Sequence, residues 1–195
     1  GYIQGFTGEH VGEPRLIIAL YELPNSNPSL VHVDFKFVSL TDAAQRVDNT
    51  QVIWERSSSL SDIYASTEYA YPQPDCQWIE NRFWIWVHYG AGKIARGEYF
   101  EALEFLSFLR TVVLSPLALQ QASLTPSGVR TIEKRLPAFA AELKQTLATA
   151  ERDSLIPAFE ACIALYLRLR NKTTAKVNSR AQQLAISYFN DELKA

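Results

Sequence analysis

The spacing of apolar residues changes its period near residue 76, and this change is the strongest constraint on the fold. In residues 30–38 apolar and polar side chains alternate, as they do along a β-strand with two unlike faces. From Gln77 onward apolar residues recur at spacings of three and four, which is typical of helices buried on one face. The order predicts an α+β fold, in which a small mixed sheet precedes an antiparallel helical bundle.

The first part of the chain is predicted to hold short strands. Residues 15–21 form a continuous apolar run, which predicts a strand buried on both faces, with a buried helical segment as the alternative. Residues 24–29 hold two prolines and predict a turn, so this run and residues 30–38 are expected to be antiparallel neighbours. The other elements expected here are a glycine-bearing loop at 7–14, a short helix through Arg46 capped by Ser39 or Thr41, and a strand at 51–56.

The second part is predicted to be helical throughout. Asp75 or Cys76 precedes a helix over 77–96, which Gly97 ends. Further helices are expected at 98–114 (ending before Pro116), at 129–150 (with Pro137 as a kink or as its true first turn), at 153–170 (capped by Asp153 or Ser154) and at 174–193. The domains are therefore predicted as an α/β segment at 1–57, a linker at 58–75 and a helical domain at 76–195.

Composition argues against several classes of protein. The chain of 195 residues carries a net charge of −2, so no basic field favours a nucleic-acid partner. No apolar run in the sequence approaches the ~18 residues of a membrane span. Cys76 and Cys162 lie far apart without the spacing of a zinc site, and we expect them to be reduced thiols in a cytoplasmic protein.

The beginning of the chain leads to a further expectation. The sequence contains no methionine and opens on Gly1, so we expect either residues upstream of Gly1 or methionines left out of the sequence. Three short strands and one helix also bury too little apolar surface to stand alone. The apolar run at 15–21 therefore predicts further sheet neighbours, from missing N-terminal strands or from a partner chain.

Asp34 is the first candidate for chemistry. It lies in the middle of the alternating strand and shares one face with His32 and Lys36, while Val33 and Phe35 fall on the other face. A carboxylate in this position can ligate a metal ion or accept a proton from a hydroxyl group. The alternative is a solvent-facing residue paired with His32 or Lys36, which is common on strands with one polar face.

Arg82 and Lys93 are the candidates for binding a nucleotide. Helical spacing places them on one side of the predicted helix at 77–96, together with Trp86 and Tyr89. Cations beside aromatic rings suit a nucleotide, whose phosphates pair with Arg and Lys and whose base stacks on a ring. The alternative is that the rings pack in the core and the cations form solvated ion pairs. Three further residues, Glu98, Glu101 and Glu104, are predicted either to hold a cation or to form a solvated face.

Several segments, taken in order, resemble a bacterial nucleotidyltransferase-like family of the DNA polymerase β superfamily, similar to the aminoglycoside and lincosamide nucleotidyltransferases. The matching segments are FTGEHVGEPR at 6–15, HVDFKFV at 32–38, RV at 46–47, VIWER at 52–56, QWIENRFW at 77–84 and KIARGE at 93–98. The resemblance implies a catalytic domain, of which 1–57 is the C-terminal part, and a helical domain that closes over the nucleotide. It implies Mg²⁺-dependent transfer of a nucleoside monophosphate from ATP or another NTP to a hydroxyl of a small, antibiotic-like molecule.

The resemblance also implies roles for residues. Asp34 fits the third carboxylate of the family, which acts as a metal ligand or general base, and Arg82 and Lys93 fit phosphate contacts. The family's Gly-Ser turn and Asp-x-Asp strand fall upstream of Gly1, so we expect this chain to be inactive alone. The alternative function is a non-catalytic nucleotide-binding module, or a helical module for assembly as a homodimer.

Overall fold

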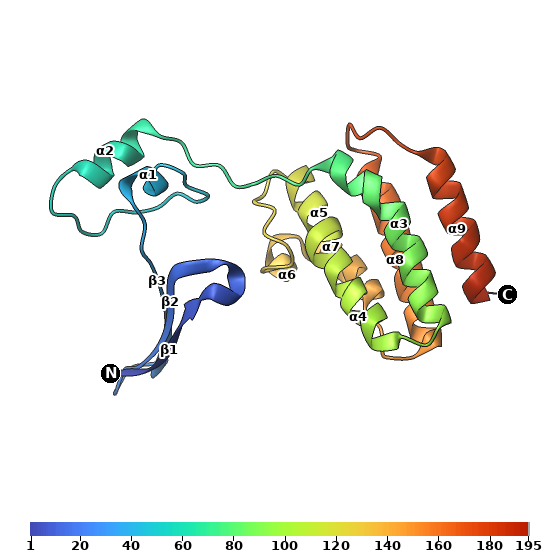
Figure 1. The fold of residues 1–195 in the computed structure, drawn as a ribbon, viewed down its shortest axis with the longest axis horizontal. Helices are drawn as coiled ribbons and strands as arrows, with labels where there is room; N and C mark the ends of the chain where they lie inside the picture. Colours follow the sequence, from blue (N-terminus) through green and yellow to red (C-terminus); the bar gives the residue numbers. More distant parts are fainter. Residues whose placement is uncertain (195) are drawn as a thin grey trace. The chain divides into compact units, whose positions relative to one another are not determined.

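A computed structural model describes residues 1–194, and the chain divides into two compact units, Gly1–Tyr71 and Pro72–Ala195. Each unit is described by itself (Figure 1). The elements of the first unit are β1 Tyr2–Gly8, the 3₁₀ helix η1 Glu9–Val11, β2 Glu13–Glu22, β3 Leu30–Lys36, α1 Leu40–Ala43 and α2 Ser59–Ser66. Those of the second are α3 Cys76–Ala95, α4 Tyr99–Phe108, the π-helical η2 Leu109–Leu114, α5 Ser115–Gln121, α6 Ile132–Arg135, α7 Pro137–Leu143, the 3₁₀ helix η3 Lys144–Thr146, α8 Arg152–Arg170 and α9 Ser179–Lys194. The predicted α+β class is confirmed.

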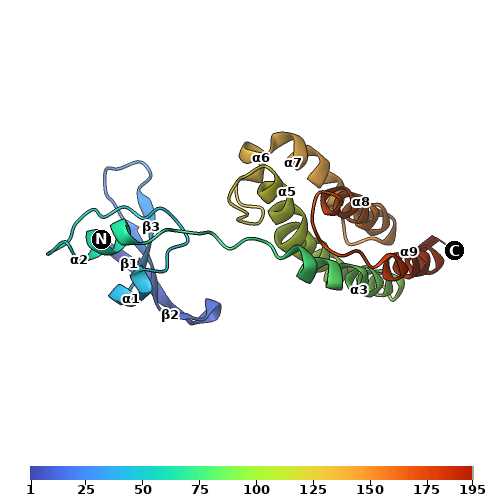
Figure 2. The same cartoon turned by 90° about the horizontal axis from the view of Figure 1, so that it is seen from above.

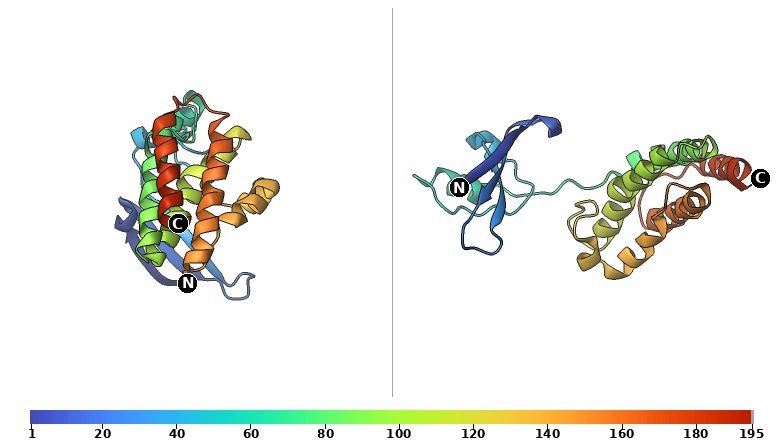
Figure 3. Two further views of the ribbon diagram at one scale, coloured as in Figure 1. Left: turned by 90° about the vertical axis from the view of Figure 1, so that its right-hand side faces the viewer. Right: turned by 90° about the horizontal axis from the view of Figure 1, so that it is seen from below.

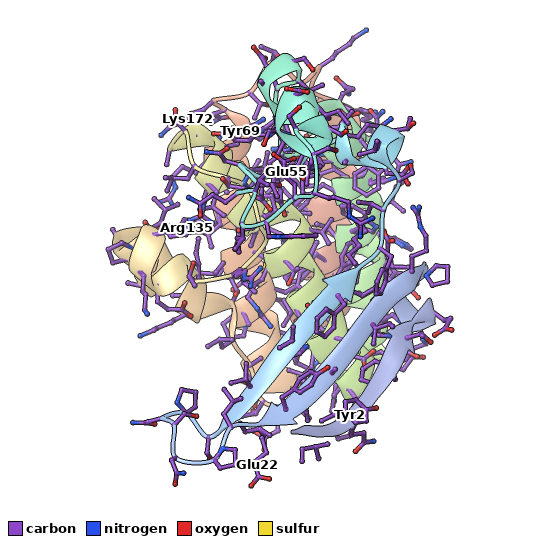
Figure 4. All side chains as sticks on the ribbon, turned by 90° about the vertical axis from the view of Figure 1, so that its left-hand side faces the viewer. Tyr2, Glu22, Glu55, Tyr69, Arg135 and Lys172 are labelled. Atoms are coloured by element: carbon purple, nitrogen blue, oxygen red, sulfur yellow. The ribbon has the colours of Figure 1, made fainter. Side chains whose placement is uncertain are left out.

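The sheet of the first unit is antiparallel, in the order β1-β2-β3, so the predicted mixed sheet is wrong for the strands described. The prediction that β2 and β3 are antiparallel neighbours is confirmed, and Ile18 of β2 lies opposite Asp34 of β3. Figure 4 shows β1 and β2 side by side, with Tyr2 and Glu22 labelled at one end of the pair. No strand was predicted before residue 15, so β1 was missed, and the loop predicted at 7–14 is wrong at both ends, since Thr7 and Gly8 belong to β1 and Glu13 begins β2. The two strands are joined by residues 9–12 and pair directly, but Gly5 and Gly8 weaken the alternating apolar pattern that would have indicated β1.

Both faces of this sheet are open in the first unit. The apolar run of β2 was predicted to be buried on both faces, and this is wrong for the residues described: Ala19 is buried, whereas Ile17 and Leu20 are more than a third exposed. Because successive strand residues point to opposite faces, Ile17 and Leu20 lie on different faces and both contact solvent. The unit thus has strands with the composition of a sheet interior but little covering them.

The segments after β3 differ in part from the prediction. Of the two predicted caps, Ser39 caps α1: its hydroxyl accepts from the Asp42 N–H, and the Asp42 carboxylate accepts from the Ser39 N–H. The helix ends at Ala43, so the predicted extension through Arg46 is wrong. The predicted strand at 51–56 is wrong, because these residues pair with no strand among those described. Helix α2 lies within the predicted linker at 58–75, and the boundary between the two units falls after Tyr71.

The second unit is a helical bundle whose directions follow from its contacts. Helix α4 runs antiparallel to α3, since Trp86 contacts Phe108 while Lys93 contacts Glu101. Helix α9 runs parallel to α3, because Gln77 bonds to Lys176 near the start of both helices and contacts between the two continue along them. Figure 3 shows α3, α8 and α9 side by side. The predicted bundle is present, but α3 and α9 depart from a strictly antiparallel arrangement.

The core of the bundle brings α3 and α8 close together at Gly90. Phe159 of α8 is fully buried, and its ring lies where a Cβ on Gly90 would be, 2.2 Å from Cζ. Phe105 and Phe189 pack on the same ring, with centroid separations of 6.1 and 5.8 Å. A side chain at position 90 is therefore incompatible with the packing of Phe159.

A buried polar network ties α3, α8 and α9 together around Glu80. The Glu80 carboxylate accepts hydrogen bonds from Trp84 Nε1 (3.1 Å), from the Tyr166 hydroxyl and from Arg170 Nη1 (3.3 Å). Burial and the Glu80 carboxylate raise the pKa of Tyr166 well above its usual range. The backbone N–H of Asn178 also donates to Glu80 at 3.3 Å, so one buried carboxylate fixes the segment that leads into α9.

The helix predicted to end before Pro116 continues through it. Elements α4, η2 and α5 form one helical stretch, Tyr99–Gln121. Proline interrupts a regular helix because it has no N–H and its ring clashes with the carbonyl four residues back. Here Ser115 N–H donates to Arg110 O, five residues back, and the wider π turn admits the ring.

The expectation that no stretch approaches a membrane span is wrong by length and composition: within residues 1–194, Tyr99–Gln121 is long and apolar enough. Its most apolar 18 residues have a mean hydropathy of 1.6, and 56% of that window is buried inside the unit. The core helix of a bundle meets the same criterion of length and composition.

The remaining helix boundaries show which local signals are reliable. Asp75 caps α3, accepting from Trp78 N–H at 2.9 Å, as predicted. Pro137 begins α7, so the predicted helix at 129–150 is broken into short pieces, of which α6 packs on α7 and η3 packs on α8; Figure 2 shows α6 and α7 next to each other. Glu151, rather than Asp153 or Ser154, precedes α8, and α9 begins at Ser179 instead of residue 174.

Candidate functional site

The polar face of β3 carries the first predicted site residue. Asp34 Oδ1 lies 2.7 Å from His32 Nε2, and both side chains are more than half exposed. Two residues along the same face, Lys36 Nζ pairs with Glu13 Oε1 at 3.1 Å. The strand therefore presents an accessible carboxylate that lies beside an imidazole.

This arrangement limits what Asp34 does chemically. An exposed carboxylate beside an imidazole accepts a proton from a hydroxyl group or supplies an oxygen ligand to a metal ion. Among residues 1–194, no group of three or more His, Cys, Asp or Glu side chains lies close enough to hold a metal ion. Asp34 is thus one oxygen donor, and the Mg²⁺ site that the sequence predicts is not formed by the described residues alone.

Arg82 lies in an aromatic row on α3. Its guanidinium carbon is 4.3 Å from the centre of the Trp78 ring, and Nη1 donates to Trp78 O at 3.1 Å. Trp78 in turn meets Trp86 edge-on, with ring centres 5.5 Å apart. Arg82 does lie beside an aromatic face, but the ring is Trp78 rather than the predicted Trp86 or Tyr89, and the cation–π contact orients its guanidinium.

Lys93 is buried, and it is already paired. Its ammonium lies over the Tyr89 ring at 4.3 Å, contacts Glu101, and stands 3.6 Å from Glu98 Oε2. Arg96 bonds both oxygens of Glu98, at 2.8 and 2.9 Å, and holds the pKa of that carboxyl below its ordinary value. The cation that two of the three predicted glutamates hold is therefore Lys93 itself.

Lys93 opens into a cavity of about 470 Å³ between α3 and α4. Trp86 and Tyr89 line one side, and Phe105, Phe108 and Glu104 line the other. Sequence reasoning grouped Glu104 with the acidic residues but missed Phe105 and Phe108 as lining residues. Their spacing along α4 was the available signal, since residues three and four apart share a helix face.

Arg82 and Lys93 are not brought together. They are eleven residues apart on one helix, a rise of about 16 Å at 1.5 Å per residue. Each has its own aromatic partner, Trp78 for Arg82 and Tyr89 for Lys93. The two cations therefore lie at separate positions along α3 and do not form one phosphate site. Asp34 belongs to the other compact unit.

Comparison of the chain with protein-family models gave no match, and comparison with curated proteins gave none either.

Proposed function

We propose that this chain belongs to a Mg²⁺-dependent nucleotidyltransferase, which moves a nucleoside monophosphate from a nucleoside triphosphate to a hydroxyl of a small molecule. The motif resemblance supports the reaction class. One observation carries the assignment of a role: the carboxylate of Asp34 is accessible at the centre of a strand and lies 2.7 Å from an imidazole nitrogen. A general base needs this kind of access to the proton it removes.

The residues of this chain have separate tasks in the proposed reaction. Asp34 takes the proton from the acceptor hydroxyl, and the His32 imidazole lies beside the carboxylate, with Nε2 2.7 Å from Oδ1. Arg82 has guanidinium N–H groups beyond the one bonded to Trp78 O and offers them to phosphate oxygens. Lys93 reaches a phosphate only by exchanging its contact with Glu101.

Magnesium needs more than these residues. The ion prefers six oxygen ligands and neutralises the developing phosphate charge when bound. Asp34 supplies one carboxylate, and the described residues bring no second one to it. The donor set therefore does not fit a complete magnesium site: Asp34 would supply one oxygen ligand, and the proposal otherwise assigns these residues to proton transfer and phosphate contact.

Binding of Mg²⁺–ATP tests this proposal. Isothermal titration calorimetry is run on the unaltered chain, on Asp34→Ala and on Glu22→Gln, which changes another exposed carboxylate near the same sheet. We expect Asp34→Ala to weaken binding while Glu22→Gln leaves it unchanged, with equal urea unfolding midpoints for all three. Unchanged binding with an altered midpoint would assign Asp34 to structure, and absence of Mg²⁺–ATP binding by the unaltered chain would refute the proposal.

A second candidate is an assembly module that pairs with another copy through α3 and α9. The observation that favours it is a groove of about 330 Å³ between these helices, lined by Ile85 and Leu184, which are 66% and 51% exposed. Exposed apolar side chains of this size are typical of interfaces when they cluster. Light scattering should show a dimer at micromolar concentration that Ile85→Lys converts to a monomer. A monomer at every concentration would exclude this role.

A further inference from the structure

A second cavity of about 500 Å³ lies at the end of the bundle away from Lys93. Its floor is apolar and comes from three helices, with Ala118 of α5, Phe139 of α7 and Leu169 of α8, all of them buried. Its volume is in the range of small-molecule sites, and its lining is mostly apolar with a few polar groups, as in such sites.

Charge is distributed unevenly around this floor. Arg135, Arg168 and Lys172 line the cavity, and Glu142 is the carboxylate among its lining residues. Glu142 is paired with Arg168. Arg135 and Lys172 have no carboxylate partner among residues 1–194, so two positive charges remain uncompensated. The chain as a whole carries a net charge of −2, so the excess positive charge is local to this cavity.

Arg135 is held in position by neutral groups. Its Nη1 donates to Ser127 Oγ at 2.8 Å, and its Nη2 donates to Thr125 O at 2.6 Å. These bonds fix the guanidinium without neutralising it, so its charge is retained beside the apolar floor. A fixed guanidinium is suited to an anionic head group, because less side-chain entropy is lost on binding.

The cations at the end of α8 have a simpler explanation, which does not extend to Arg135. Basic side chains near a helix C-terminus interact favourably with the helix dipole; Arg168 in the last turn of α8 fits that role, as does Lys172, which follows the helix end at Arg170. Arg135 lies on α6, and Figure 4 labels it together with Lys172. The positive charge of Arg135 therefore comes from a different helix than Arg168 and lines the same cavity.

We propose that this cavity binds a small amphiphilic anion, a molecule with one carboxylate or phosphate head and an apolar body. The head group pairs with Arg135 and Lys172, and the body packs on Phe139, Ala118 and Leu169. The inference is independent of nucleotidyl transfer, because it uses none of the residues assigned to that reaction.

Titration with octanoate, hexyl phosphate and neutral octanol tests the proposal. Calorimetry is run on the unaltered chain, on Arg135→Gln, on Lys172→Gln and on the double variant. Lys134→Gln is the matched control, since Lys134 is also on α6 but does not line the cavity. We expect at least one of the two anions to bind at one saturable site, and octanol not to bind. Each cavity variant should weaken the affinity for the anion about tenfold, and the control variant should leave it unchanged.

Amide chemical shifts locate the bound anion. Shifts confined to the neighbourhood of Ala118, Phe139 and Leu169 support the proposal. Octanoate binding alone identifies a carboxylate head, and hexyl phosphate binding alone identifies a phosphate head. Four outcomes would each overturn the proposal. Two concern the ligand: no binding of either anion, or binding of octanol as tight as that of the anions. The others are shifts in the sheet unit, and full anion affinity in the double variant with an unchanged unfolding midpoint.

Discussion

Gly90 and Gly92 are two glycines of one helix for which we predict opposite effects of the same substitution. Replacing a helix-interior glycine by alanine stabilises a helix by up to about 1 kcal/mol, because the unfolded backbone loses freedom. At Gly92 the nearest atom to a new Cβ is Arg96 Nη1 at 3.1 Å, the end of an exposed and flexible side chain. Gly92→Ala should therefore keep most of that gain.

At Gly90 the new Cβ would lie 2.2 and 2.3 Å from two carbons of the Phe159 ring. Carbon atoms in contact are normally about 3.5–4.0 Å apart, so the overlap exceeds 1 Å by rough estimate. Phe159 is buried between Phe105 and Phe189 and has little room to move. Overpacking of this kind costs about 1–3 kcal/mol, so Gly90→Ala should lose up to about 2 kcal/mol after the helix gain is included.

The two variants should differ by up to about 3 kcal/mol in the free energy of unfolding. Thermal unfolding of the full chain, followed by circular dichroism at a wavelength where helix dominates, measures the difference, which corresponds to about 10 °C in Tm. Adding Phe159→Leu to Gly90→Ala should cost less than the sum of the two single changes, because the smaller side chain makes room. Equal stability of Gly90→Ala and Gly92→Ala would refute this account of α3–α8 packing.

Three further predictions follow from single side chains. Glu80→Ala should destabilise the helical unit by about 3–5 kcal/mol in urea unfolding, because it leaves a buried guanidinium unpaired, and a loss below 1 kcal/mol would contradict this. Burial raises the pKa of the Cys162 thiol to about 12, so iodoacetamide at pH 8 should modify Cys76 and leave Cys162 unmodified until the chain unfolds, as peptide mass spectrometry would show. Hydrogen bonds from Arg15 and Ser39 lower the pKa of Asp42 to about 2, so its contribution to stability should be complete above pH 4 and lost as the pH falls toward 2. Arg15→Gln should raise that pKa in a carboxyl NMR titration.

Local signals predicted the parts of the fold that depend on local chemistry. The alternation of β3 and the caps at Asp75 and Ser39 each act within a few residues, and each is among the features that the sequence predicted at these positions. The strand at Tyr2–Gly8 could not be predicted in this way, because its evidence is a partner in β2 rather than its own pattern.

The candidate site was predictable in residue type but not in arrangement. The accessible carboxylate of Asp34 and the aromatic row beside Arg82 follow from period and helical spacing. The burial of Lys93 does not, because its ammonium is neutralised by Glu101 from the next helix, and that contact depends on how α3 and α4 pack. The anion cavity was not predicted for the same reason, since three separate helices form its floor.

The π turn at Leu109–Leu114 has a consequence for changes in chain length. A π segment accommodates one residue more than a regular α-helix over the same rise, so the flanking helices keep their buried faces although the count between them is longer. Deleting one residue from this segment should restore regular helix without rotating either flank, whereas a deletion inside Tyr99–Phe108 would turn the apolar face of α4 by about 100°. The shortened helix would then meet Pro116 in regular geometry, which costs about 3 kcal/mol. Loss of a residue here is therefore expected to be tolerated only together with replacement of that proline, which makes the length of this helix and the identity of residue 116 a linked pair.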